Sequence, residues 1–319
     1  MRILGIETSC DETAVSILDE KGIVSESVFS QIDIHSRYGG VVPEIASREH
    51  LKKLNLIIEE CLSNAGMGME GVDAVAVTSR PGLEGSLLVG LMTARTISFL
   101  MKIPLIEVDH LEAHLFASAF TGLDDPPGIG LIISGGHSRL VYIKAWGDYE
   151  ILGNTRDDAV GECFDKVASV LGLPYPGGPS IERSASGGDP DKFKFPVANM
   201  GGSYDFSYSG LKTAVLYKVK YDFDGKITEE ERKNISASFQ KAAFKPLLKN
   251  SIKAMEEFGA NWLLVCGGVA ANGELRRQFE TESGKKQLKI VFPEKAHCTD
   301  NASMVAACGQ FYLNRNLKT

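Results

Sequence analysis

The 319-residue sequence has no C-x-x-C pair, and its six cysteines are spread from Cys10 to Cys308. This spacing argues against a disulfide framework and favours reduced thiols in the cytoplasm. No window of about 18 residues is continuously apolar, so the sequence predicts no transmembrane helix. The first residues show no basic region followed by an apolar stretch and a cleavage site, and we expect no secretory signal. These absences together predict a cytoplasmic protein that does not enter a membrane.

An excess of positive charge is also missing, since the formal net charge is −7 and the sequence pI is near 5.5. An acidic chain does not attract nucleic acid as a whole, so any RNA contact requires a local basic patch or a basic partner. One candidate patch exists on a predicted helix, at four-residue spacing: Lys241, Lys245, Lys249 and Lys253. A solvated helix face and an RNA-phosphate contact are both compatible with this stripe.

The chain is long for a single core and has room for two lobes. Apolar patterning predicts three strands, a helix over residues 43–64, and alternating strands and helices up to residue 120. After a linker pattern at 121–128, the strand–turn–strand pattern recurs from residue 130. We therefore predict an α/β fold with an internal duplication, in which mixed sheets are flanked by helices. The expected boundaries are an N-terminal lobe at 1–122 and a C-terminal lobe at 123–300, with an insertion near 189–235 and a C-terminal helix, 301–319, packing back on the first lobe.

Small, glycine-rich turns follow or precede several of the predicted strands and helices, at residues 8–12, 134–138, 176–179 and 267–268. Glycine lets backbone N–H groups approach phosphate oxygens, and a helix N-terminus favours an anion. Four such turns favour a nucleotide site over plain connections. None of them matches the Walker lysine loop or an uninterrupted dinucleotide fingerprint.

Two histidines, His110 and His114, lie four residues apart on a predicted helix. On a helix such positions share a face, so both imidazoles could bind one metal ion, although two packed histidines would have the same spacing. The spacing resembles the zinc-protease motif H-E-x-x-H, but at about 100° per residue Glu112 falls on the opposite face. The pair therefore suggests a metal without suggesting proteolysis. Candidates for a third ligand, all at ends of predicted elements, are His137, His297, Asp300, Asp11 and Glu12.

With these residues assembled, the chain closely resembles one family over nearly its whole length, the universal tRNA adenosine threonylcarbamoyltransferases, once labelled O-sialoglycoprotein endopeptidases. The turn 134–137 and the segment 298–301 are similar to those of the bacterial branch. Nine segments occur in the family's order: 5–13 (GIETSCDET), 39–44 (GGVVPE), 110–114 (HLEAH), 134–137 (SGGH), 161–166 (GECFDK), 175–179 (YPGGP), 206–212 (FSYSGLK), 267–272 (GGVAAN) and 298–301 (CTDN).

The resemblance implies the duplicated two-lobed actin/Hsp70/sugar-kinase fold, which is ribonuclease H-like, with a ligand cleft between the lobes. It implies that His110, His114 and Asp300 bind one iron or zinc ion. It also implies that ATP, AMP or threonylcarbamoyl-AMP binds along a set of second-lobe residues: Ile132, Ile133, Ser134, Gly135, Gly136, Asp165, Gly178, Glu182 and Asn272. From the residues alone, Asp165 is either a helix-surface salt-bridge partner or an acceptor for a ribose hydroxyl.

The expected activity is transfer of the threonylcarbamoyl group from threonylcarbamoyl-AMP to N6 of the tRNA adenosine next to the anticodon, with release of AMP. We expect Asp11 or Glu12 to orient or deprotonate the attacking amine, because alignment supplies much of the rate for a poor nucleophile. The resemblance also implies three partners: tRNA, a related two-lobed protein and a small ATPase. The rivals are a phosphotransferase of the same fold, a metalloprotease and a non-catalytic scaffold. Histidine ligands argue against the magnesium site of a phosphotransferase.

Overall fold

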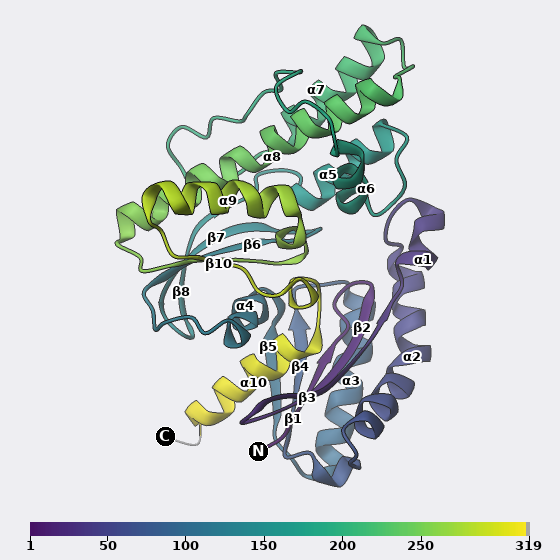
Figure 1. The fold of residues 1–319 in the computed structure, drawn as a ribbon. Coiled ribbons are helices and arrows are strands. Elements are labelled where there is room, and N and C mark those ends of the chain that lie inside the picture. Colours follow the sequence, from purple (N-terminus) through teal and green to yellow (C-terminus); the bar gives the residue numbers. More distant parts are fainter. Residues whose placement is uncertain (317–319) are drawn as a thin grey trace. The chain divides into compact units, whose positions relative to one another are not determined.

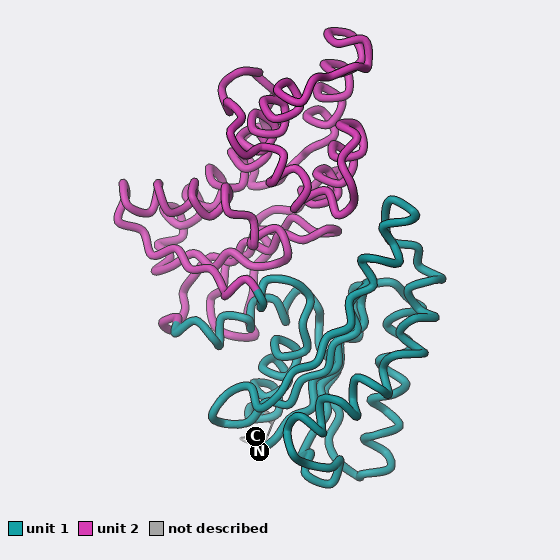
Figure 2. Tube along the Cα trace, turned by 45° about the vertical axis from the view of Figure 1, so that its right-hand side comes forward, with its two compact units in different colours: residues 1–122, 296–319 teal, residues 123–295 magenta. Residues whose placement is uncertain are grey.

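The computed structural model describes residues 1–316, which divide into two compact units (Figure 2): residues 1–122 with 296 onward, and residues 123–295. The expected helix 301–319 is α10, Ala302–Asn316, and its last three predicted residues lie outside the described part of the chain. Residues 296–300 belong to unit 1, so the boundary lies at Lys295 and not at residue 300. The reason is local packing, because His297 contacts Phe120 of unit 1 with ring centroids 5.1 Å apart.

Unit 1 contains a five-stranded sheet in the order β3-β2-β1-β4-β5. Its strands and helices are β1 Ile3–Glu7, β2 Glu12–Asp19, β3 Gly22–Ser30, α1 Ile32–His35, α2 Pro43–Asn64, β4 Ala74–Arg80, α3 Glu84–Met101, β5 Leu105–Asp109, α4 His110–Phe116 and α10. The first three strands are antiparallel neighbours, whereas β4 and β5 run parallel to β1.

Unit 2 repeats this topology with the order β10-β9-β6-β7-β8. Its elements are β6 Gly128–Ile133, β7 Ser138–Ala145, β8 Asp148–Asn154, α5 Val160–Val170, α6 Gly177–Ala185, α7 Ser209–Tyr217, α8 Glu229–Phe258, β9 Leu263–Cys266, α9 Gly273–Lys286 and β10 Ile290–Val291. Again three antiparallel strands precede two strands parallel to the first of them. The predicted duplication and two-lobed α/β class are therefore confirmed.

The two faces of the unit 1 sheet differ because neighbouring residues on a strand point to opposite sides. Leu4 and Val75 pack with Leu54 of α2 in one apolar core. On the other face α10 comes close to small residues, and a Cβ on Gly5 would lie 2.3 Å from the carbonyl oxygen of Ala302. Figure 1 shows α10 lying along β1, β4 and β5. Most of α10 is buried, as its apolar sequence predicts.

In unit 2 the turn predicted at 176–179 is the start of helix α6, and the predicted insertion contains a further helix, α7. Proline and glycine at the start of α6 read as a turn, yet Gly177 is the first residue of a helix whose N-cap is Pro176. Glu229 begins α8 through a capping box between Thr228 and Glu231. The expected insertion near 189–235 thus contains α7 and the first turns of α8. Within residues 1–316 no helix combines the length and apolarity needed to cross a membrane.

Candidate metal centre and nucleotide site

The histidine pair lies at the start of α4, directly after β5. The Asp109 carboxylate caps this helix by accepting from the backbone N–H groups of Leu111 at 2.9 Å and Glu112 at 3.2 Å. The two imidazoles extend from the same face one helical turn apart, with ring centroids 4.7 Å apart and planes at 72°. Both histidines are buried, His114 completely.

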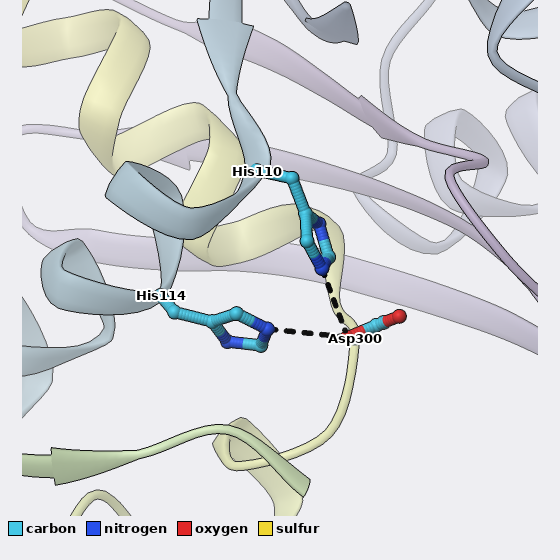
Figure 3. Close-up of side chains that lie close together, drawn as sticks. All are labelled: His110, His114 and Asp300. Carbon is cyan, nitrogen blue, oxygen red and sulfur yellow. Dashed lines mark ion pairs between the residues drawn. The ribbon is translucent and has the colours of Figure 1, made fainter. Parts of the chain in front are cut away.

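Asp300 completes the cluster from the loop before α10. Its Oδ1 lies 3.3 Å from Nε2 of His114 and 3.6 Å from Nε2 of His110 (Figure 3). One ligand atom from each of the three residues lies within 4.8 Å of the others, so they could hold a metal ion together. Neither ring nitrogen of the fully buried His114 has a hydrogen-bond partner among the described residues. Because buried polar atoms are normally satisfied, an Nε2 that faces Asp300 without a hydrogen bond fits a metal ligand better than a histidine that only packs in the core.

Two carboxylates, those of Glu7 and Asp300, lie close to the buried imidazole of His110. Burial lowers the pKa of His110, but the carboxylates of Asp300 and Glu7 outweigh it and raise this pKa to about 9. For Glu7 the two effects have the opposite signs. Burial raises the pKa of Glu7, but the charge and hydrogen bond of His110 lower it by more, so this pKa lies below its usual value. A cation is therefore strongly favoured at this position, whether it is a proton or a metal ion.

Glu112 lies on the face of α4 opposite to the two histidines, because it is two residues from each of them on the helix. Its Oε1 accepts a 2.5 Å hydrogen bond from the hydroxyl of Tyr312 on α10. A zinc protease requires a carboxylate beside the metal to activate water. In this chain the residue between the histidines is bonded to α10, which does not fit that mechanism.

The two carboxylates predicted to act on the amine, Asp11 and Glu12, lie at the beginning of β2 in the same unit. Asp11 is buried, and Glu12 accepts from the hydroxyl of Ser30 at 3.3 Å. Burial raises the pKa of Glu12 well above its usual value, and the charges of Asp11 and Asp300 raise it further. Their influence means that the three carboxylates share one electrostatic environment. The catalytic role of Asp11 and Glu12 stays a prediction.

The predicted nucleotide residues of unit 2 meet at the carboxyl ends of the parallel strands β6 and β9. The side chains of Ile132 and Ile133 are buried in the core, so only their backbone can contact a ligand. The turn from Ser134 to His137 is closed by a 2.8 Å bond from Ser134 N to His137 O. It also rests on α5, because Gly135 O accepts from Glu162 N at 3.0 Å. Beside Gly135 and Gly136 an added Cβ would meet only open space.

Three polar residues of the predicted site join the surrounding helices. Asp165 Oδ1 accepts from Gly177 N at 2.7 Å, and Glu182 Oε1 accepts from Gly273 N at 2.8 Å. Asn272 caps α9 by accepting from Leu275 N. Each residue therefore stabilises a helix N-terminus, a role that the sequence interpretation had not assigned to it. Gly178, in the first turn of α6, has open space where a Cβ would be.

Sequence reasoning missed Glu7, the fully buried carboxylate that contacts His110. Its Oε2 lies 3.2 Å from His110 Nδ1 and accepts from the Thr78 hydroxyl at 2.5 Å, while its Oε1 accepts from Ser9 N at 2.5 Å. A signal was present, because a glutamate ends an otherwise apolar strand that pairs on both sides. A buried charge normally has a specific partner.

Two α/β units of one topology, with a potential metal centre in the first, define a two-lobed protein of the actin/Hsp70/sugar-kinase class. Solved structures agree on the fold. Component A of the (R)-2-hydroxyglutaryl-CoA dehydratase of Acidaminococcus fermentans is similar with a TM-score of 0.58 at 16% identity, covering 97% of both chains. Full-length HypF in its phosphate- and nucleotide-bound form is similar with a TM-score of 0.63 at 14% identity, covering 98% of this chain and 46% of that one.

Sequence comparison identifies the family within this class. Residues 22–307 match the model of tRNA N6-adenosine threonylcarbamoyltransferase. Curated proteins of that name are 49% identical in Synechococcus sp. (97% of this chain, 87% of that one) and 47% identical in Thermosipho africanus (97% and 93%). A third, from Caldicellulosiruptor bescii, is 44% identical over 99% of this chain and 94% of its own. The chain belongs to the tRNA N6-adenosine threonylcarbamoyltransferase family, and the resemblance inferred from its motifs is confirmed.

Proposed function

We propose that this chain transfers a threonylcarbamoyl group from threonylcarbamoyl-AMP to N6 of the tRNA adenosine beside the anticodon, releasing AMP. Family membership over residues 22–307 carries the proposal, and the His110, His114 and Asp300 cluster gives it a chemical centre. The phosphotransferase alternative has no support from the curated relatives, which are named as threonylcarbamoyltransferases.

The metal that we propose for the cluster is iron or zinc. Two imidazoles and one carboxylate are a donor set used by catalytic zinc and by non-haem iron(II), whereas magnesium prefers oxygen ligands and water. When bound, such an ion supplies Lewis-acid polarisation of a carbonyl or phosphoryl oxygen. The chain's own contribution is the burial of both histidines and the carboxylates beside them, which favour a cation. Asp11 or Glu12 would orient the amine, or accept its proton.

For the nucleotide we propose the backbone of Ser134, Gly135 and Gly136 as the contact for its anionic oxygens, with Asp165, Gly178, Glu182 and Asn272 around the adenosine part. The open space beside the two glycines and the two helix N-termini held by Asp165 and Glu182 support this assignment.

The direct test is a reconstituted reaction with tRNA and threonylcarbamoyl-AMP. We expect N6-modified adenosine and AMP in equal amounts, and metal analysis of protein purified without chelators should find iron or zinc. Stoichiometric turnover of ATP with a small acceptor, and no modified adenosine, would instead establish the phosphotransferase.

We propose that tRNA contacts the lysine stripe of α8. Lys241 is paired with Asp191 at 2.5 Å, and Lys253 donates to Gly202 O at 2.7 Å. By contrast, Lys245 and Lys249 are exposed and have no ion pair or hydrogen bond within residues 1–316. Both line a cavity of about 490 Å³ between α8 and residues 197–207.

Two phosphate contacts cannot hold a tRNA against a net charge of −7, so we expect weak, salt-sensitive binding by the isolated chain. Changing Lys245 and Lys249 to Glu should weaken tRNA binding and leave AMP binding unchanged. The same change at Lys21 and Lys226, two exposed lysines elsewhere, is the matched control. Tight, sub-micromolar binding that the first pair does not alter would overturn this assignment.

We further propose that a related two-lobed protein and a small ATPase assist the reaction in the cytoplasm. Large apolar side chains are exposed on α2 and α3, which pack side by side: Leu51, Leu56, Leu88, Met92, Phe99 and Leu100. Phe99 is 82% exposed, and large apolar side chains exposed on neighbouring helices are candidates for a protein interface. The cytoplasmic location is supported by six free cysteines, five of them buried. Phe99→Asp should prevent co-purification of the two-lobed partner while metal binding is retained.

A further inference from the structure

Glu7 and His110 form a buried carboxylate–imidazole pair on the side of the histidine that faces away from Asp300. The imidazole Nδ1 lies 3.2 Å from Glu7 Oε2, while Nε2 of the same ring lies 3.6 Å from Asp300 Oδ1. A neutral ring that donates Nδ1–H to a carboxylate keeps its lone pair on Nε2, and a metal ion that binds at Nε2 takes the place of the second proton. The carboxylate therefore selects the tautomer in which the nitrogen nearer Asp300 is free to bind a metal.

The position of Glu7 is itself fixed by hydrogen bonds from strand β4 and from the bend that follows β1. Thr78 on β4 donates its hydroxyl to Oε2 at 2.5 Å, and the backbone N–H of Ser9 donates to Oε1 at 2.5 Å. Glu7 is completely buried and sits at the end of β1, which is hydrogen-bonded to β2 and β4. A carboxylate held in this way on the central strand of a sheet has little freedom to move toward a substrate. Its geometry suits holding a neighbour in place.

The second histidine has no equivalent support. His114 is completely buried, and its Nδ1 has no hydrogen-bond partner among the described residues. The two imidazoles of the cluster are therefore unequal: Nδ1 of His110 contacts a carboxylate, whereas Nδ1 of His114 has no hydrogen-bond partner among the described residues.

We infer that Glu7 is the positioning residue of the metal centre, holding His110 in the Nδ1–H tautomer so that Nε2 binds the ion, and that His110 is consequently the anchoring ligand of the pair. This inference rests on the proposed metal site. It separates Glu7 from the neighbouring carboxylates Asp11 and Glu12, which we propose act on the amine. Carboxylates that orient metal-binding histidines typically contribute 10–100-fold to metal affinity.

The first experiment measures Zn²⁺ and Co²⁺ affinity of the full chain by chelator competition. Glu7→Gln keeps the size of the side chain but removes its charge, and we expect 10–100-fold weaker binding and an altered Co²⁺ absorption spectrum. Glu112→Gln is the matched control, because the same change is made on α4 itself in a side chain that bonds to Tyr312. Its affinity should equal that of the wild type.

A second control addresses Ser9, whose hydroxyl lies 3.3 Å from the same His110 nitrogen. If the serine hydroxyl held the ring, Ser9→Ala would lose metal affinity and Glu7→Gln would not. We expect the reverse order. Rescue by Glu7→Asp should be incomplete, because the shorter side chain cannot reach both Thr78 and His110 without a shift.

The outcomes are distinct. Wild-type protein that binds neither ion overturns the metal site and this inference together. Wild-type protein that binds, with Glu7→Gln binding equally well, overturns only the role of Glu7. Should Glu7→Gln fail to fold, nitrogen-detected NMR of the zinc-loaded wild type decides instead: a protonated Nδ1 on His110 supports the inference, and zinc on Nδ1 refutes it.

Discussion

Replacing Gly161 with alanine tests how closely the Ser134–Gly136 turn must rest on α5. The added Cβ would lie 2.6 Å from Ser134 O and 2.8 Å from Gly135 Cα. The first distance is about 0.8 Å inside the 3.4 Å of an ordinary contact. Both neighbours are backbone atoms, so no side chain can rotate away. The turn or the first turn of α5 has to move.

The cost follows from two opposing effects. Overpacking of this kind typically costs about 1–3 kcal/mol, while replacing a helical glycine by alanine returns roughly 0.5–1 kcal/mol. The difference is about 0–2.5 kcal/mol, and we expect a net loss of about 1–2 kcal/mol in the stability of unit 2, because both close neighbours are backbone atoms that cannot rotate away. Gly210→Ala is the matched control: it is also the second residue of its helix, and an added Cβ there meets nothing within 4 Å. That variant should be neutral or slightly stabilised.

The assay combines thermal denaturation with calorimetric titration of AMP. If AMP binds the turn in its present position, binding to Gly161→Ala must restore a strained arrangement, and about 1.4 kcal/mol of strain corresponds to roughly tenfold weaker affinity. A melting temperature equal to that of Gly210→Ala would refute the packing argument. A lower melting temperature with unchanged AMP affinity would show that the nucleotide does not use this turn.

Three further predictions concern single carboxylates. Asp300→Ala should lower metal affinity and threonylcarbamoyl transfer by at least roughly 10–100-fold, the loss typical for residues that only hydrogen-bond to a metal ligand. Full metal content in the variant protein would remove this residue from the ligand set. Glu112→Gln should retain transfer activity, and a protease activity that disappears in this variant would contradict the geometry of α4. Asp158 has a lowered pKa because the hydrogen bonds and charges of Lys166 and Lys212 outweigh the effect of burial. The stabilisation by the ionised Asp158 is present above the usual aspartate pKa and is lost as the pH falls through the lowered folded-state pKa. Asp158→Asn should therefore be less stable than the wild type at pH 7, and its stability should fall less than that of the wild type on acidification. Unfolding midpoints at pH 7 and about pH 3 measure this, and a parallel acid loss in both proteins would contradict it.

The element pattern was accessible from the sequence wherever local periodicity was strong. Helix α2 begins and ends as predicted, at Pro43 and Asn64, because an N-terminal proline and apolar positions at helical spacing are local signals. The start of α6 was not accessible, because Pro176 and two glycines have the composition of a turn. Only the docking of this segment on α5, where Gly177 N bonds Asp165, makes it a helix.

The sequence by itself determined that His110 and His114 share a helix face, because the α-helical period is fixed by the backbone. It also determined family membership through nine ordered motifs. The tertiary structure decided the rest of the centre. Asp300 is 186 residues beyond His114, and no local rule brings it there; α10 packing against β1 and β4 does so. The partner of Glu7 could not be identified from the sequence for the same reason, since His110 is 103 residues away and meets it only because β1, β4 and β5 lie side by side in one sheet.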